Sequence, residues 1–106
     1  MAYIQPTYKV SESITEKYLI NTYNFKKSEY GLTLRFPVYK YKNKPLIFAE
    51  FIYDGEENNI HVRATDNNGN SCNYNKEEYG KSDVIEKINK EIWKKLNELI
   101  NGGVIC

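Results

Sequence analysis

The fold follows from residues 32–65, which read LTLRFPVYKYKNKPLIFAEFIYDGEENNIHVRAT. This stretch contains runs rich in β-branched and aromatic residues, which are typical of β-strands. We expect strands over residues 32–42, 45–54 and 59–65. Short segments rich in turn-forming residues, Asn43-Lys44 and residues 55–58, separate them. Consecutive hairpins of this kind predict an antiparallel meander whose strand order follows the sequence.

The two turns also predict which residues pair across the sheet. With Asn43-Lys44 as the first turn, Phe36 is expected opposite Phe51. With Glu56 and Glu57 at the tip of the second hairpin, Phe51 is expected opposite Val62. The same two registers align Leu34 with Tyr53 and Ile60, and Val38 with Ala49 and Ala64. Since all these apolar residues then share one face, we predict that this face is the core.

A C-terminal amphipathic helix, expected over residues 82–101, is the element that covers the core face. Its apolar residues recur at three- and four-residue spacing: Ile85, Ile88, Ile92, Leu96 and Leu99. Ser82 or Asp83 can cap its start, and Gly102 and Gly103 are typical of a helix end.

The remaining elements have weaker signals. Ser13 and Glu16 have the spacing of a capping box, which favours a short N-terminal helix, although residues 18–25 also have the composition of a strand. Asn68-Gly69 predicts a hairpin turn into a fourth strand over residues 71–74. The prediction is one α+β domain over residues 1–106, in which an antiparallel meander of about four strands packs on one face against the C-terminal helix.

Composition excludes several classes of protein. The chain has 106 residues, 41% of them hydrophobic, which is enough for a globular core without metal or disulfides. The chain has fifteen basic and fourteen acidic residues, so bulk attraction to nucleic acid or to an anionic membrane is weak. There is no signal peptide and no apolar run long enough for a membrane span, so we expect a cytoplasmic protein without a membrane partner. Cys72 and Cys106 lack the spacing of a metal site.

The second face of the sheet carries the candidate site. Alternation along the strands places both arginines of the protein and its only histidine there. Glu50 is expected between Pro37 and Arg63. The candidate binding residues are Arg35, Tyr39, Tyr41, Phe48, Glu50, His61, Arg63 and Tyr74.

Several interpretations of this face compete. The N-terminal segment could pack over it, making Leu46, Phe48 and Ile52 a second small core. It could instead bind another protein, because interface centres are enriched in aromatic residues and arginine, or it could pair with a second copy as a homodimer. It could also bind a nucleotide or single-stranded nucleic acid, with bases stacked on Tyr39, Phe48 or Tyr74 and phosphates bound by the arginines.

No catalytic, cofactor or metal signature is present in the sequence. His61 stands without a recognisable nucleophile, and the glycines do not form a phosphate-binding loop. We therefore predict a small non-enzymatic protein-binding module without a cofactor. The richness in lysine, asparagine and tyrosine is typical of phage or mobile-element products, which favours an inhibitor of a host defence protein. The alternative is a nucleotide or single-stranded nucleic-acid binding protein.

Overall fold

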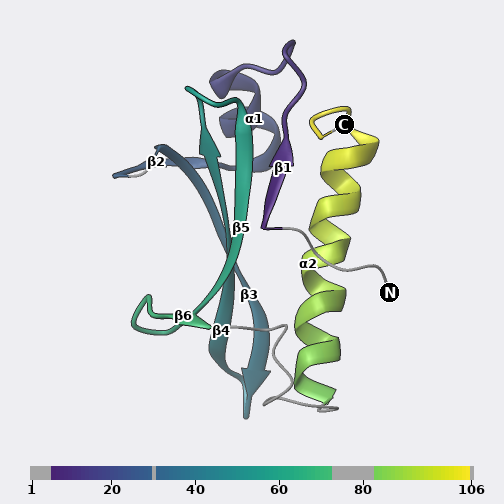
Figure 1. The fold of residues 1–106 in the computed structure, drawn as a ribbon. Coiled ribbons are helices and arrows are strands. Elements are labelled where there is room, and N and C mark those ends of the chain that lie inside the picture. The colour runs from purple at the N-terminus through teal and green to yellow at the C-terminus, as the bar shows by residue number, and fades with distance from the viewer. Residues whose placement is uncertain (1–5, 30, 73–82, 106) are drawn as a thin grey trace.

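The computed structural model describes residues 6–29, 31–72 and 83–105 and has an α+β architecture (Figure 1). The elements are β1 (Thr7–Lys9), α1 (Glu16–Tyr23), β2 (Lys26–Ser28), β3 (Gly31–Tyr41), β4 (Lys44–Asp54), β5 (Asn59–Asp66), β6 (Ser71–Cys72) and α2 (Asp83–Asn101). The strands form one antiparallel sheet, and α2 runs along one face of it. The predicted fold class is confirmed.

The sheet has the order β1-β5-β4-β3-β2, with β6 paired to the same edge of β5 as β1. The β3–β4–β5 meander is the predicted one. Two short strands, β1 and β2, extend it at opposite edges and were not predicted, because three residues are too few to show a periodic pattern. β6 confirms a fourth hairpin strand as far as Cys72, and Tyr74 lies outside the described residues.

The first hairpin differs from the predicted register by two residues. Leu34 pairs with Phe51, and the turn residues are Lys42 (φ 50°) and Asn43 (φ 66°), not Asn43 and Lys44. The predicted turn would have made Pro45 part of the hydrogen-bonded pair that closes a two-residue turn, and proline has no N–H to donate. A shift of two preserves the alternation, so the core face is nevertheless the predicted one. The register of the second hairpin is confirmed, with Phe51 opposite Val62.

A β-bulge interrupts β3 at Val38. Pro37 pairs with Phe48 but Tyr39 pairs with Ile47, so Val38 is an extra residue in β3. Val38 is buried as predicted, and Tyr39 and Ile47 both pack against the core. The placement of Tyr39 on the second face was therefore wrong, because an unbroken alternation was assumed across the bulge.

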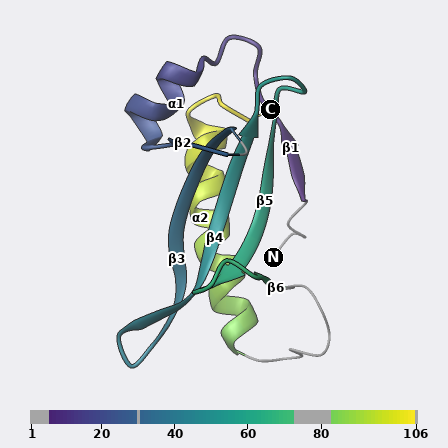
Figure 2. The same cartoon turned by 90° about the vertical axis from the view of Figure 1, so that its left-hand side faces the viewer.

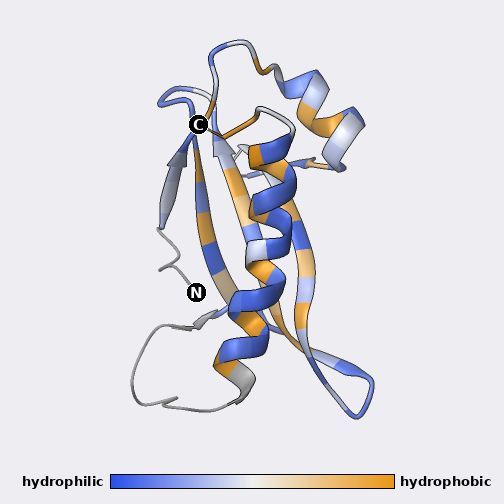
Figure 3. Cartoon of the chain, turned by 90° about the vertical axis from the view of Figure 1, so that its right-hand side faces the viewer, coloured by the Kyte–Doolittle hydropathy of each residue, from blue (hydrophilic) through white to orange (hydrophobic). Residues whose placement is uncertain are grey.

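The core lies between the sheet and α2, which crosses in front of the strands in Figure 3. Of the apolar positions predicted from helical spacing, Ile88, Ile92, Leu96 and Leu99 are buried, and Ile85 is half-buried against the core. The helix ends as expected: the Gly102 N–H donates to the Glu98 carbonyl (2.9 Å), and Gly103 has a positive φ of 76°.

The N-terminal segment forms the favoured helix, and the strand alternative for residues 18–25 is wrong. Thr15, not Ser13, caps α1: its hydroxyl accepts a hydrogen bond from the Tyr18 N–H (3.1 Å). Leu19 is fully buried in the core. α1 lies at the end of the sheet close to the C-terminal end of α2 (Figures 1 and 3).

Candidate binding face

The face of the sheet opposite α2 is the candidate site. Figure 2 looks onto this face, with β3, β4 and β5 in front of α2. We call it the open face and define it by Thr33, Arg35, Pro37, Phe48, Glu50, Ile52, His61 and Arg63. Among the described residues of the N-terminal segment, β1 extends the sheet edge, α1 packs on the core side through Leu19, and the exposed strand β2 overhangs only one end of the face. The expectation of a second core beneath that segment is therefore wrong for this part of the chain.

An ionic row crosses the centre of the open face. Arg35, Glu50 and Arg63 are direct neighbours on β3, β4 and β5. The Glu50 carboxylate accepts from the Arg63 Nε at 2.6 Å and lies 3.3 Å from the Arg35 Nε. Glu50 was expected between Pro37 and Arg63, and the two-residue register shift puts Arg35 in place of Pro37. One carboxylate thus orients two guanidinium groups, and the row keeps a net positive charge.

The row is unevenly exposed to solvent. The Glu50 side chain is 12% exposed, whereas those of Arg35 and Arg63 are 38% and 40% exposed. Water screens the arginines, so each pair stabilises the fold by about 0.2–1 kcal/mol. The buried carboxylate therefore acts mainly to fix the directions of two half-exposed cations.

Arg35 is held by two further contacts. Its guanidinium carbon lies 3.9 Å from the centroid of the Phe48 ring, in a cation–π arrangement. Its Nη2 donates to the backbone carbonyl of Asp66 (3.2 Å). One face of the Phe48 ring is consequently covered by Arg35.

Two overhangs bound the open face. β2 projects away from α2 (Figure 1), and Ser28 and Glu29 help to enclose a hollow of about 250 Å³. Its lining is Ser28, Glu29, Thr33, Glu50, Ile52 and Arg63. The Ser28 and Thr33 hydroxyls are hydrogen-bonded to each other at 2.7 Å. Sequence reasoning missed Ser28 and Glu29, because β2 is an exposed strand with no apolar pattern.

The β5–β6 turn forms the second overhang. The Asp66 carboxylate accepts hydrogen bonds from the backbone N–H groups of Asn70 and Asn68, at 2.9 Å each. These bonds, that of Asn70 first, hold the pKa of Asp66 below its ordinary value. The turn is thereby fixed in a shape that presents the Asp66 carbonyl to Arg35.

His61 lies toward the β1 edge of the open face. It is exposed and pairs with Ile52 on β4 and with Thr7 on β1. Its Nδ1 lies 3.1 Å from the Thr7 hydroxyl oxygen, so the two share a hydrogen bond. Among the described residues there is no group of three or more histidine, cysteine or acidic residues that could hold a metal ion.

The structure gathers part of the predicted set on this face and separates the rest. Brought together on the open face are Arg35, Phe48, Glu50, His61 and Arg63. Tyr39 lies on the core side. Tyr41 lies at the far end of the β3–β4 hairpin, 56% exposed, with the Lys42 ammonium 5.5 Å from the centroid of its ring.

Comparisons with known proteins support the fold and do not indicate a function. The sequence matches no protein-family model and no curated protein. The structure is similar to the crystal structure of a DUF1831 family protein from Lactobacillus plantarum, with a TM-score of 0.67 and 12% identity over 96% of this chain and 88% of that one. At this identity the likeness concerns the fold alone. No helix in the described part of the chain is long and apolar enough to cross a membrane.

Proposed function

We propose that this chain is a non-enzymatic binding protein that engages another protein through its open face. The observation that carries the proposal is the Arg35–Glu50–Arg63 row, set beside Phe48 and Ile52 on a sheet face that no described helix covers. Arginine and aromatic side chains dominate the energetically important centres of protein interfaces. A cation held in place before binding loses less conformational entropy when the partner arrives.

The arrangement of Arg35 favours a protein partner over a base-stacking role for this face. The guanidinium over Phe48 occupies a ring face on which a nucleobase would stack. Tyr39, a second expected stacking residue, lies on the core side. Glu50 adds a negative charge between the two arginines, which opposes phosphate binding.

Catalysis has little support from the same geometry. Nucleophilic catalysis needs a nucleophile and a base within hydrogen-bond reach of each other, in a position that orients both. The Thr7 hydroxyl and the His61 imidazole are within that reach, at 3.1 Å, but the pair is exposed near the edge of the sheet, and among the described residues no carboxylate is hydrogen-bonded to His61 to orient it. The narrower hypothesis of a phage or mobile-element inhibitor that blocks a host defence protein is one form of this proposal, and it draws on composition alone.

Site-specific photo-crosslinking tests the proposal. A photoreactive phenylalanine analogue replaces His61 on the open face or, as the matched control, Asn97, an exposed residue of α2. We expect a discrete protein adduct from position 61 in a lysate of the producing organism, and no such adduct from position 97. Ile52→Asp should abolish the adduct while the circular dichroism spectrum stays native. Equal adducts from both positions, or none from position 61, would overturn the proposal, and an adduct of twice the chain's mass would identify the partner as a second copy.

A further inference from the structure

The end of the β3–β4 hairpin has a charge unlike the rest of the chain. Residues 39–44 read YKYKNK, with three lysines and no acidic residue, whereas the whole chain carries a formal charge of only +1. The hairpin extends beyond the neighbouring strands, and its tip is blue in Figure 3. Lys40, Lys42 and Lys44 are all exposed, with Tyr41 between them. An aromatic ring and three cations are thus presented together.

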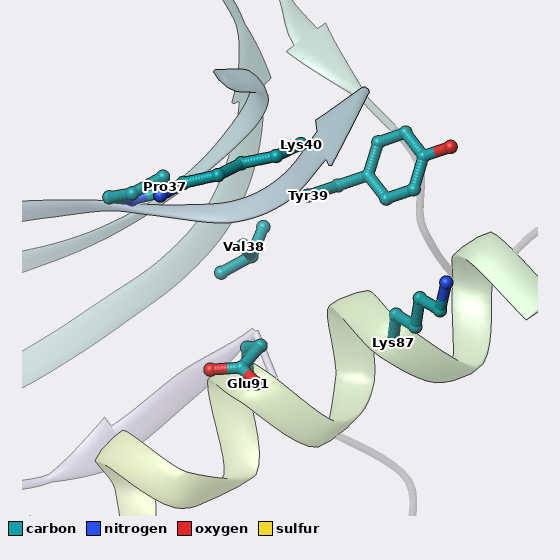
Figure 4. Close-up of a pocket in the computed structure, with 6 residues that line it drawn as sticks. All are labelled: Pro37, Val38, Tyr39, Lys40, Lys87 and Glu91. Atoms are coloured by element: carbon teal, nitrogen blue, oxygen red, sulfur yellow. The ribbon is translucent and has the colours of Figure 1, made fainter. Parts of the chain in front are cut away.

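A hollow of about 340 Å³ adjoins this hairpin, between β3 and α2 (Figure 4). It is lined by Pro37, Val38, Tyr39, Lys40, Lys87 and Glu91. In Figure 4 the side chain of Lys87 rises from α2 toward the ring of Tyr39. The volume is at the lower end of the range for small-molecule sites, which suits one nucleoside better than a large ligand.

The bulge at Val38 is what places Tyr39 at this hollow. The extra residue turns Tyr39 to the side of the sheet that carries α2, where it pairs with Ile47. Bulges commonly re-aim a side chain beside a functional site. Tyr39 and Tyr41 therefore lie at the same end of the molecule as four lysines, Lys87 included.

We propose that this hairpin end and hollow bind single-stranded nucleic acid, separately from the open face. Lysines placed close together repel one another, and a chain of phosphates neutralises several of them at once. Tyr41, which is 56% exposed, favours nucleic acid over an acidic peptide, because its ring offers a stacking surface for a base. It favours a single strand over a duplex, because a paired base is already stacked between its neighbours. Glu91, the acidic residue in the lining, has its charge offset by the Lys94 ammonium at 3.1 Å.

Fluorescence anisotropy with a labelled oligothymidylate of about 12 nucleotides tests this site. Neutralising three or four phosphates should make log K fall with log salt at a slope of about −2 to −3. Lys42→Glu with Lys44→Glu should weaken binding by about tenfold or more. The matched control, Lys26→Glu with Lys27→Glu on β2, makes the same change in net charge and should weaken it far less. Tyr41→Ala should weaken it about 5- to 100-fold, with the salt slope unchanged.

Four results would overturn this inference: equal affinity for a duplex of the same length, equal losses in the hairpin and β2 variants, no effect of Tyr41→Ala, or no binding to the oligonucleotide at all. Anionic vesicles serve as a second probe, and binding to them with the same dependence on Lys42 and Lys44 but none on Tyr41 would also overturn it. The His61 crosslinking experiment reports on a different face. Failure of either proposal can therefore be distinguished from failure of the other.

Discussion

Replacing Glu50 with glutamine tests whether the ionic row organises the open face. Glutamine keeps the size of the side chain but removes the charge that lies between the two arginines. The variant loses the attraction to the Arg63 Nε at 2.6 Å and the Arg35 Nε at 3.3 Å, and it leaves the two cations to repel each other. Charge-assisted hydrogen bonds are stronger than neutral ones, so the substitution weakens both contacts. Because the Glu50 side chain is only 12% exposed, water screens its charge less than in a surface pair, and the loss of stability is larger.

The magnitude follows from the exposures. Each ion pair contributes about 0.2–1 kcal/mol to the free energy of unfolding, because the arginines are 38% and 40% exposed and water screens them. Loss of both pairs, together with the new repulsion between the arginines, should lower that free energy by about 1–2 kcal/mol. In a domain of this size that corresponds to a fall in Tm of roughly 4–12 °C. Urea denaturation should show a lower midpoint with an unchanged m-value.

The control is Glu98→Gln on α2. Its pair with Lys95 is also short, at 2.7 Å, but the Glu98 side chain is 57% exposed. This variant should lose less than about 0.5 kcal/mol. The difference between the two variants should shrink in about 1 M salt, although less than it would for a fully exposed pair. Equal stabilities of the Glu50→Gln and Glu98→Gln variants at low salt would refute the reasoning, because the row would then contribute no more than an ordinary surface pair.

Two further predictions concern the scaffold of the sheet. Gly31→Ala should lower the free energy of unfolding, measured by urea denaturation, by about 2–4 kcal/mol, because Gly31 has φ +119° and an added Cβ would lie 2.6 Å from the Tyr53 carbonyl oxygen. The control Gly69→Ala, at φ +87° with open space around it, should lower it by only about 1 kcal/mol. Equal losses in the two variants would show that the close approach to Tyr53 is unimportant. Burial, followed by the charges of Glu16 and Asp54, raises the pKa of Tyr53 above its ordinary value of 10.0. The resulting contribution of Tyr53 to the free energy of unfolding is complete below pH 10.0 and is lost as the pH rises through the folded-state pKa. Tyr53→Phe should therefore show a shallower loss of stability in alkali than the natural chain, and parallel pH profiles would contradict this assignment.

The core face was predictable because alternation survives an error of two residues. With the first turn assigned to Asn43-Lys44, every predicted partner in that hairpin was wrong. Leu34 and Phe51 were nevertheless predicted on the correct, buried side of the sheet. The helix was equally predictable, since its apolar spacing extends over several turns. β1 and β2 were not, because their pairing depends on the edges that β5 and β3 offer them and not on any pattern of their own.

The placement of Tyr39 in the candidate site failed because a bulge changes which side of the sheet the following residue faces. Up to Pro37 the strand follows simple alternation, so Arg35 lies where the sequence places it. Beyond Val38 the alternation is reversed, and Tyr39 faces the helix side instead. The bulge at Val38 removes Tyr39 from the open face, where arginine remains the main exposed functional group. It places Tyr39 on the side of α2, beside the lysines of the β3–β4 hairpin. The bulge thus contributes to the chemical difference between the two proposed surfaces by moving one tyrosine from one side to the other. Variants in Arg63 and Tyr41 should affect the two ligands independently.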